Sequence, residues 1–134
     1  MFEMHQKVLF KHCDPAGIVF YPRYFEMIND CVEAFFDEVL GAPFESLHQS
    51  GAVPTAQINT KFNAPSRHGD HLILQLSITA VGRSSAVYGI IALCADQRRF
   101  ETTATLVNVD ALGKPVQWPS ELSKILHDFK DKIQ

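Results

Sequence analysis

The chain has 134 residues, which suits a single domain covering residues 1–134. Hydrophobic residues make up 46% of the chain and charged residues 20%, a balance typical of globular proteins and unlike that of disordered or fibrous ones. The formal net charge of −3 argues against nucleic-acid binding, because neutralising phosphates needs clustered Lys and Arg.

The sequence predicts a cytoplasmic protein with neither a membrane span nor a metal site. No stretch approaches the roughly 18 consecutive apolar residues that a membrane-spanning helix needs, and the first residues do not follow the signal-peptide pattern. The 3 cysteines form no CxxC pair, and the 6 histidines are scattered along the chain. We therefore expect no membrane partner, no bound metal and reduced thiols.

The beginning of the chain is predicted to be a strand followed by a loop. Residues 3–11 alternate loosely between apolar and polar, which indicates a strand. Residues 12–22 contain Pro15 and Gly17, which are typical of a loop, yet residues 18–21 are all apolar. Because a surface loop gains nothing from a run of apolar side chains, we expect this segment to be buried or to line a pocket.

A long helix is predicted from Arg23 to near Gly41. Pro22 suits its first turn, because the missing N–H of proline would be unpaired there anyway. Residues 43–50 indicate a short helical connection capped by Gly51. The apolar positions of the long helix recur at three- and four-residue steps: Phe25, Ile28, Val32, Phe35, Phe36 and Val39.

The second half of the chain is predicted to be mostly strand. Strict two-residue alternation between Leu72 and Ile78 is the strongest strand signal. A hairpin turn is expected at residues 82–85, and a final helix opens at Ser120. The expected strands are residues 53–63, 71–81, 86–95 and 99–109. With the first strand they make a five-stranded antiparallel sheet crossed by the long helix, an α+β domain.

Asp14 is the strongest candidate for chemistry. It lies between a predicted strand end and the loop that leads into the long helix, whose first N–H groups are unpaired and partly positive. A carboxylate and donors that can hold an oxyanion are the two parts of an acyl-transfer site. The spacing alone also allows Asp14 to be an ordinary Asp-Pro turn residue.

The segment from Asp14 to Phe25 resembles the signature of the 4-hydroxybenzoyl-CoA thioesterase family of hotdog-fold proteins. The resemblance implies a sheet wrapped around a long central helix and hydrolysis of an acyl-CoA thioester. It implies that the Asp14 carboxylate either attacks the thioester carbonyl or activates a water molecule, while the backbone N–H of Tyr21 holds the thioester oxygen. No cofactor is expected, because the CoA thioester is the substrate.

His12 lies two residues before Asp14, so in an extended segment the two side chains point to the same side, and His12 either acts on Asp14 or is a structural residue at the strand end. The resemblance implies roles for other residues. The turn at residues 83–85 either contacts the CoA phosphates or is a solvated hairpin, and Arg67 and His68 raise the same question. Asn59 and Thr60 either approach the acyl group from a neighbouring subunit or pair within a strand. The complete expected set of substrate- and CoA-binding residues is His12, Gly17, Ile18, Val19, Asn59, Thr60, Arg83, Ser84 and Ser85.

Two rival functions remain open at this point. A non-catalytic acyl-CoA-binding hotdog protein would have no need for Asp14, and a hotdog hydratase or dehydratase would usually work with a histidine. The acyl group is expected to be aromatic or a short to medium chain. An uncovered sheet edge and face predict a homodimer at least, and the resemblance extends this to a homotetramer.

Overall fold

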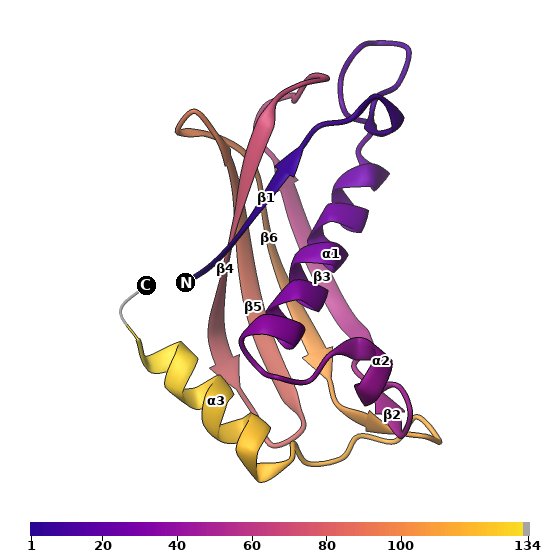
Figure 1. The fold of residues 1–134 in the computed structure, drawn as a ribbon, viewed down its shortest axis with the longest axis vertical. Helices are drawn as coiled ribbons and strands as arrows, with labels where there is room; N and C mark the ends of the chain where they lie inside the picture. The colour runs from indigo at the N-terminus through magenta and orange to yellow at the C-terminus, as the bar shows by residue number, and fades with distance from the viewer. Residues whose placement is uncertain (133–134) are drawn as a thin grey trace.

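The computed structural model describes residues 1–132, and its main layer is a five-stranded antiparallel sheet of order β1-β4-β5-β6-β3 (Figure 1). Helix α1 (Pro22–Glu38) lies along one face of this sheet, and α3 (Ser120–Asp131) packs at its lower end (Figure 1). The strands are β1 (Phe2–Lys7), β3 (Thr55–Phe62), β4 (His71–Val81), β5 (Ser85–Cys94) and β6 (Gln97–Val107). Two short strands, β2 (Gly51–Ala52) and β7 (Val109–Asp110), form a separate pair, and α2 (Phe44–Leu47) connects α1 to β2. The predicted α+β architecture is confirmed.

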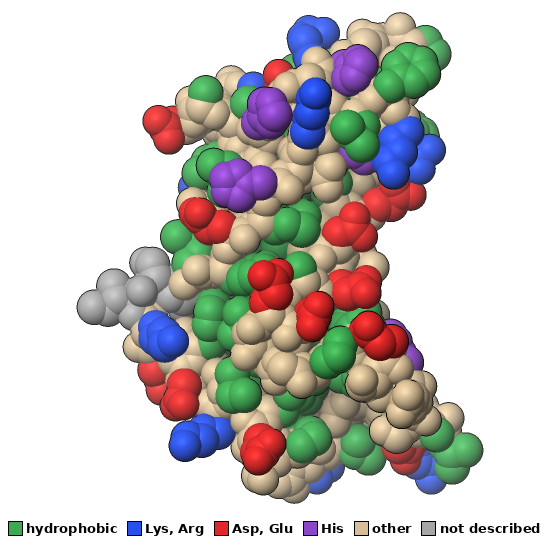
Figure 2. Space-filling view, in the orientation of Figure 1, with side chains coloured by type: hydrophobic (Ala, Val, Ile, Leu, Met, Phe, Trp, Pro, Cys, Tyr) green, Lys and Arg blue, Asp and Glu red, His purple; other side chains and the backbone are tan. Residues whose placement is uncertain are grey.

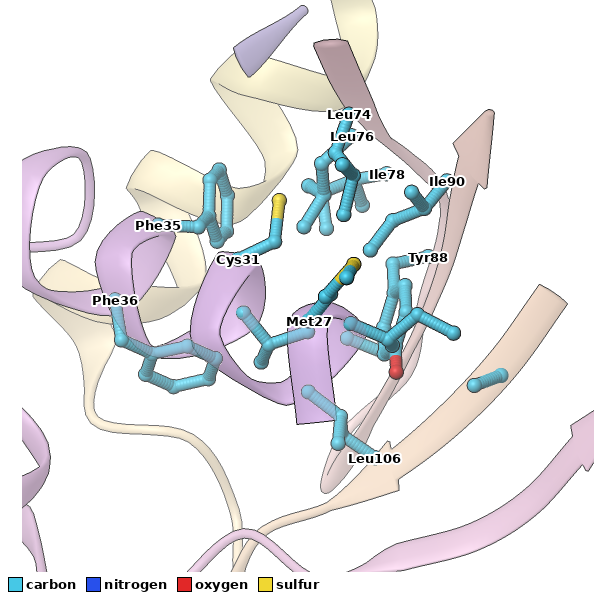
Figure 3. Close-up of a cluster of buried hydrophobic side chains, with 14 of the residues drawn as sticks. Met27, Cys31, Phe35, Phe36, Leu74, Leu76, Ile78, Tyr88, Ile90 and Leu106 are labelled. Atoms are coloured by element: carbon cyan, nitrogen blue, oxygen red, sulfur yellow. The ribbon is translucent and has the colours of Figure 1, made fainter. Parts of the chain in front are cut away.

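The core forms where the apolar side of α1 meets alternate residues of the sheet (Figure 3). The strict alternation predicted for β4 is observed, since Leu72, Leu74, Leu76 and Ile78 are all buried. The same alternation on β5 buries Ala86, Tyr88, Ile90 and Ala92. The helix contributes Tyr24, Met27, Ile28, Cys31, Val32, Phe35 and Phe36 to this core.

The other side of α1 is acidic. Figure 2 shows acidic side chains gathered over this helix. Glu26, Asp30, Glu33 and Asp37 are exposed there, three or four residues apart. The helix therefore has one apolar and one charged face, as its three- and four-residue spacing predicts.

The ends of several elements differ from the predicted ones. The first strand stops at Lys7 rather than residue 11, because Val8 turns into the core and the chain then forms a short 3-10 helix at Phe10–His12. The long helix ends at Glu38, and Gly41 follows with a φ of +63°, a conformation that favours glycine. The expectation that Gly51 caps the preceding helix is wrong, because Gly51 is the first residue of β2.

Strand β3 is an open edge of the sheet. Among the described strands it pairs only with β6, and almost all of its residues are exposed. Ile58 and Phe62 are large apolar side chains, yet they are 40% and 45% exposed. An open edge with exposed apolar residues invites pairing with another chain. Within residues 1–132, no helix is long and apolar enough to cross a membrane.

Candidate active site

Asp14 sits in a tight loop between the 3-10 helix and α1. Its Oδ1 accepts a hydrogen bond from the Ala16 N–H at 2.9 Å, and its main-chain carbonyl accepts one from Gly17 N–H at 2.9 Å. Gly17 has a φ of +82°, which a side-chain-bearing residue would adopt only with strain. Asp14 is thus a turn aspartate in its local structure. The turn fixes one carboxylate oxygen, and no residue among 1–132 bonds to Oδ2.

Tyr21 carries the N–H group that the sequence singled out. The residue caps the N-terminus of α1, and Pro22 follows as the first helical residue. No residue in the described chain accepts a hydrogen bond from the Tyr21 N–H. An unpaired N–H at a helix N-terminus is a ready donor to an electronegative atom.

The loop is held in place by the segment that precedes β4. Val19 N–H donates to the Ser66 carbonyl at 2.8 Å, and Ile18 forms a bridge with Arg67. On the other side of the loop, Phe20 N–H donates to the His12 carbonyl at 2.9 Å. The position of Asp14 therefore depends on how the segment around Ser66 is itself fixed.

Arg99 fixes that segment from β6. Its Nη1 donates to the Pro65 carbonyl at 3.0 Å, to Ser66 Oγ at 3.2 Å and to Asp70 Oδ2 at 2.7 Å. The Arg67 N–H and the Arg99 guanidinium lower the pKa of the Asp70 carboxyl, so the pair stays charged. The sequence analysis did not assign Arg99 or Asp70 a role. They lie 29 residues apart in the chain, and only the sheet brings them together.

A cavity of about 520 Å³ opens beside the loop. The cavity falls in the size range of small-molecule sites, roughly 300–1,000 Å³. Its lining is mostly apolar and aromatic. The Tyr24 hydroxyl is buried beside Ser66 without a hydrogen bond of normal geometry. Asp14 lies outside the lining itself. The lining residues are Ile18, Val19, Tyr21, Tyr24, Phe62, Asn63, Ala64 and Pro65.

His12 serves the local structure. Its ring is 4% exposed, and Nδ1 accepts a hydrogen bond from the Leu9 N–H at 2.8 Å. Burial lowers the pKa of the imidazole, and the acceptor role of Nδ1 requires the neutral ring. The structure thus favours the structural alternative for His12. Its Nδ1 is not available for proton transfer with Asp14.

The remaining predicted residues are spread over two other places. Asn59 and Thr60 lie next to each other on β3 and face opposite sides of the sheet, and Thr60 Oγ1 is 2.7 Å from Thr102 Oγ1. The turn of Arg83 to Ser85 follows β4, at the opposite end of the sheet from the Asp14 loop (Figure 1). The 11 residues of β4 separate the two ends by roughly 33 Å. The sheet therefore places this turn far from Asp14 of the same chain.

No three His, Cys, Asp or Glu side chains among residues 1–132 lie close enough to hold a metal ion. Cys13, Cys31 and Cys94 are free thiols.

The chain matches the thioesterase superfamily over residues 16–101, more than half of its length. Asp14 lies just before the matched range. No curated protein is similar enough in sequence to be matched.

Solved structures share the whole fold. A hypothetical protein from Aquifex aeolicus is 20% identical with a TM-score of 0.88, over 94% of this chain and 99% of that one. A 1,4-dihydroxy-2-naphthoyl-CoA thioesterase from Synechocystis is 18% identical with a TM-score of 0.88, over 98% of both chains. A gentisyl-coenzyme A thioesterase is 24% identical with a TM-score of 0.86, over 93% of this chain and 99% of that one. The chain therefore belongs to the thioesterase superfamily, and it is a thioester hydrolase with the hotdog fold.

Proposed function

We propose that the chain hydrolyses an acyl-CoA thioester, with Asp14 as the reacting carboxylate and the Tyr21 N–H as the donor to the thioester carbonyl. The observation that carries the proposal is the unpaired Tyr21 N–H at the start of α1, on the same loop as Asp14. The turn around Asp14 leaves Oδ2 without a partner. A donor for the carbonyl oxygen and a free carboxylate oxygen are the groups that hydrolysis of a thioester requires.

The reaction can follow two routes from this arrangement. In the first, Asp14 Oδ2 attacks the carbonyl carbon, the C–S bond breaks, and CoA leaves as a thiolate. The resulting mixed anhydride is then cleaved by water to the free acid and Asp14. In the second, Asp14 accepts a proton from a water molecule that attacks the same carbon. In both routes the Tyr21 N–H and the positive end of α1 stabilise the oxygen that becomes negative.

The cavity supports an aromatic acyl group, such as 4-hydroxybenzoyl. Three of its lining residues are aromatic: Tyr21, Tyr24 and Phe62. Flat rings pack well against such walls. Two of the similar structures are also named for aromatic acyl-CoA substrates, dihydroxynaphthoyl-CoA and gentisyl-CoA. Short and medium aliphatic acyl groups are the alternative substrates, and no cofactor takes part in either route.

A second copy of the chain completes the site in this proposal. Antiparallel pairing of two β3 edges brings the Thr55 end of one strand toward the Phe62 end of the other, and Phe62 lines the cavity. The same symmetry turns the Arg83 hairpin of the second copy toward the end of the sheet that carries this Asp14 loop. In this arrangement Arg83 acts on the substrate of the other copy, while Asn59 and Thr60 lie on the edge strand that joins the two copies. The dimer can pair again into a tetramer.

The rival functions receive less support. Superfamily membership favours an enzyme over a non-catalytic acyl-CoA-binding protein. A hydratase or dehydratase would need a reactive histidine, and His12, the histidine nearest to Asp14 in the chain, is buried with Nδ1 bound to the main chain.

The test compares wild type with Asp14→Asn on a panel of aromatic and aliphatic acyl-CoAs, following thiol release with a chromogenic reagent. Asn keeps the oxygen that accepts from Ala16 N–H, so the turn is expected to survive. We expect kcat to fall by at least about a hundredfold, on the scale of losing a nucleophile or general base.

The matched control is Asp128→Asn, the same chemical change at an exposed position of α3. It is expected to keep wild-type activity. Full activity of Asp14→Asn would refute the role of Asp14, and failure of wild type to cleave any acyl-CoA would refute the acyl-CoA substrate.

A further inference from the structure

Phe62 is an unusual residue for the last position of an edge strand. Its ring is 45% exposed, yet it contacts three aromatic rings from the first turns of α1. The centroid of Phe62 lies 5.8 Å from Tyr24 in a stacked arrangement, 5.8 Å from Tyr21 and 6.3 Å from Phe25, the last two edge-to-face. Phe62 thus bridges the open edge of the sheet to the start of α1.

The position of the ring relates it to the cavity. Phe62 lines the cavity together with Tyr21 and Tyr24. On β3, Ile58, Thr60 and Phe62 pair with the buried β6 residues Ala104, Thr102 and Phe100, so these three side chains lie on the inner face of the sheet. Beyond the Phe62 ring, the inner face of β3 continues with Thr60, whose hydroxyl is bonded to Thr102, and with Ile58, which is 40% exposed. The ring therefore stands between the cavity and the rest of the inner face of the edge strand.

We propose that Phe62 limits the length of the acyl group, so that the enzyme accepts flat aromatic or short acyl groups and rejects long chains. The inference rests on the proposed acyl-CoA substrate and assigns its specificity to one side chain. A flat acyl group lies against the face of the Phe62 ring. A long acyl chain is blocked sterically by the same ring. Removing the ring enlarges the cavity on the side of β3, where further methylene groups gain room.

The test measures kcat/KM for benzoyl-, butyryl-, hexanoyl- and decanoyl-CoA in wild type, Phe62→Ala and Phe62→Leu. Phe62→Ala is expected to raise the decanoyl to benzoyl ratio of kcat/KM by at least about tenfold, because one better-buried methylene in an apolar pocket is worth roughly 10- to 200-fold. Phe62→Leu keeps most of the bulk, so it is expected to retain the length limit and to lose roughly two- to tenfold on benzoyl-CoA, the scale of an aromatic ring pair. Phe62→Val replaces Phe62→Ala if the latter does not fold.

Phe10→Ala is the control for the loss of an exposed ring. Phe10 is 81% exposed, contacts the ring of His68 and does not line the cavity. It is expected to leave the ratio unchanged. An unchanged ratio in Phe62→Ala, or an equal change in Phe10→Ala, would overturn the inference.

Binding of non-hydrolysable S-alkyl-CoA thioethers separates this inference from the proposed reaction. Calorimetry on wild type and Phe62→Ala gives the dependence of affinity on chain length without any turnover. If wild type cleaves no thioester while Phe62→Ala shifts the preferred thioether to longer chains, the proposed hydrolysis fails and the length limit stands. Failure of wild type to bind any thioether would overturn the length limit as well.

Discussion

Arg99 provides the most demanding test of how the active-site loop is positioned. Its side chain is only 12% exposed, and one nitrogen, Nη1, serves three acceptors in the segment that holds Val19. Replacing Arg99 by Met keeps most of the apolar stem and removes these three hydrogen bonds, together with the exposed bond from Nε to Gln97 Oε1. We expect the Arg99→Met protein to fold with a looser Asp14 loop and with reduced stability.

The expected loss in the free energy of unfolding depends on whether water can replace Arg99 at each acceptor. Hydrogen bonds to charged groups are worth about 1.5–3 kcal/mol each, but an acceptor that water can reach recovers most of that energy. Pro65 is exposed and the Asp70 carboxylate is 29% exposed, so both can be hydrated. Ser66 is 0% exposed and cannot. The free energy of unfolding is therefore expected to fall by about 2–3 kcal/mol, well below the sum of three bonds.

Urea unfolding followed by the fluorescence of Trp118 measures this loss, because Trp118 is the single tryptophan and is buried. With a typical slope of about 1–3 kcal/mol per molar urea, the midpoint should drop by roughly 1–2 M. Below about pH 4 the difference between the two proteins should shrink. The lowered pKa of Asp70 stabilises the fold only above its ordinary value, and this contribution is lost as pH falls through the folded-state pKa.

Arg98→Met is the matched control for Arg99→Met. Arg98 is 49% exposed and forms a surface ion pair with Glu101, so Arg98→Met should cost less than about 0.5 kcal/mol. In the acyl-CoA assay, Arg99→Met should lower kcat and Arg98→Met should not. Equal stability and equal activity of the two variants would refute the argument that Arg99 positions the loop.

Two further predictions concern pH and assembly. Because burial lowers the pKa of His12, the unfolded chain binds more protons than the folded one below about pH 6.5, and stability should fall as pH decreases from there. His12→Asn keeps a neutral acceptor for Leu9 N–H, so urea midpoints between pH 5 and 8 should vary less than in wild type, and an identical pH dependence would contradict the assignment. Light scattering at micromolar concentration should find wild type as a dimer or tetramer, and Ile58→Lys, which charges the exposed β3 edge, should shift it toward monomer. A wild-type monomer would contradict pairing through β3.

The sequence alone was enough to predict the helices and strands with the clearest apolar periodicity. Alternation from Leu72 to Ile78 identified β4 within its observed bounds, since a strand buried on one face must repeat every second residue. The spacing of apolar residues after Pro22 identified α1 and its buried side, because one face of a helix repeats every three to four residues. The loop with Asp14 and the start of the helix at Pro22 also followed from local turn chemistry. These features depend on neighbours a few residues away in the chain.

Other features needed the tertiary structure because they depend on residues far apart in the chain. No local pattern reveals that β3 is an edge strand, since this follows from the order in which strands pair. The bond from Arg99 to Asp70, and the contact of Phe62 with Tyr24, join segments that only folding brings together. Conversely, the turn at Arg83 could be predicted as a turn, but its place at the far end of the sheet from Asp14 could not. The sequence by itself determined the buried faces of β4 and α1, because those depend on local periodicity, whereas the tertiary structure decided which distant residues meet around the cavity and which apolar side chains of β3 stay exposed.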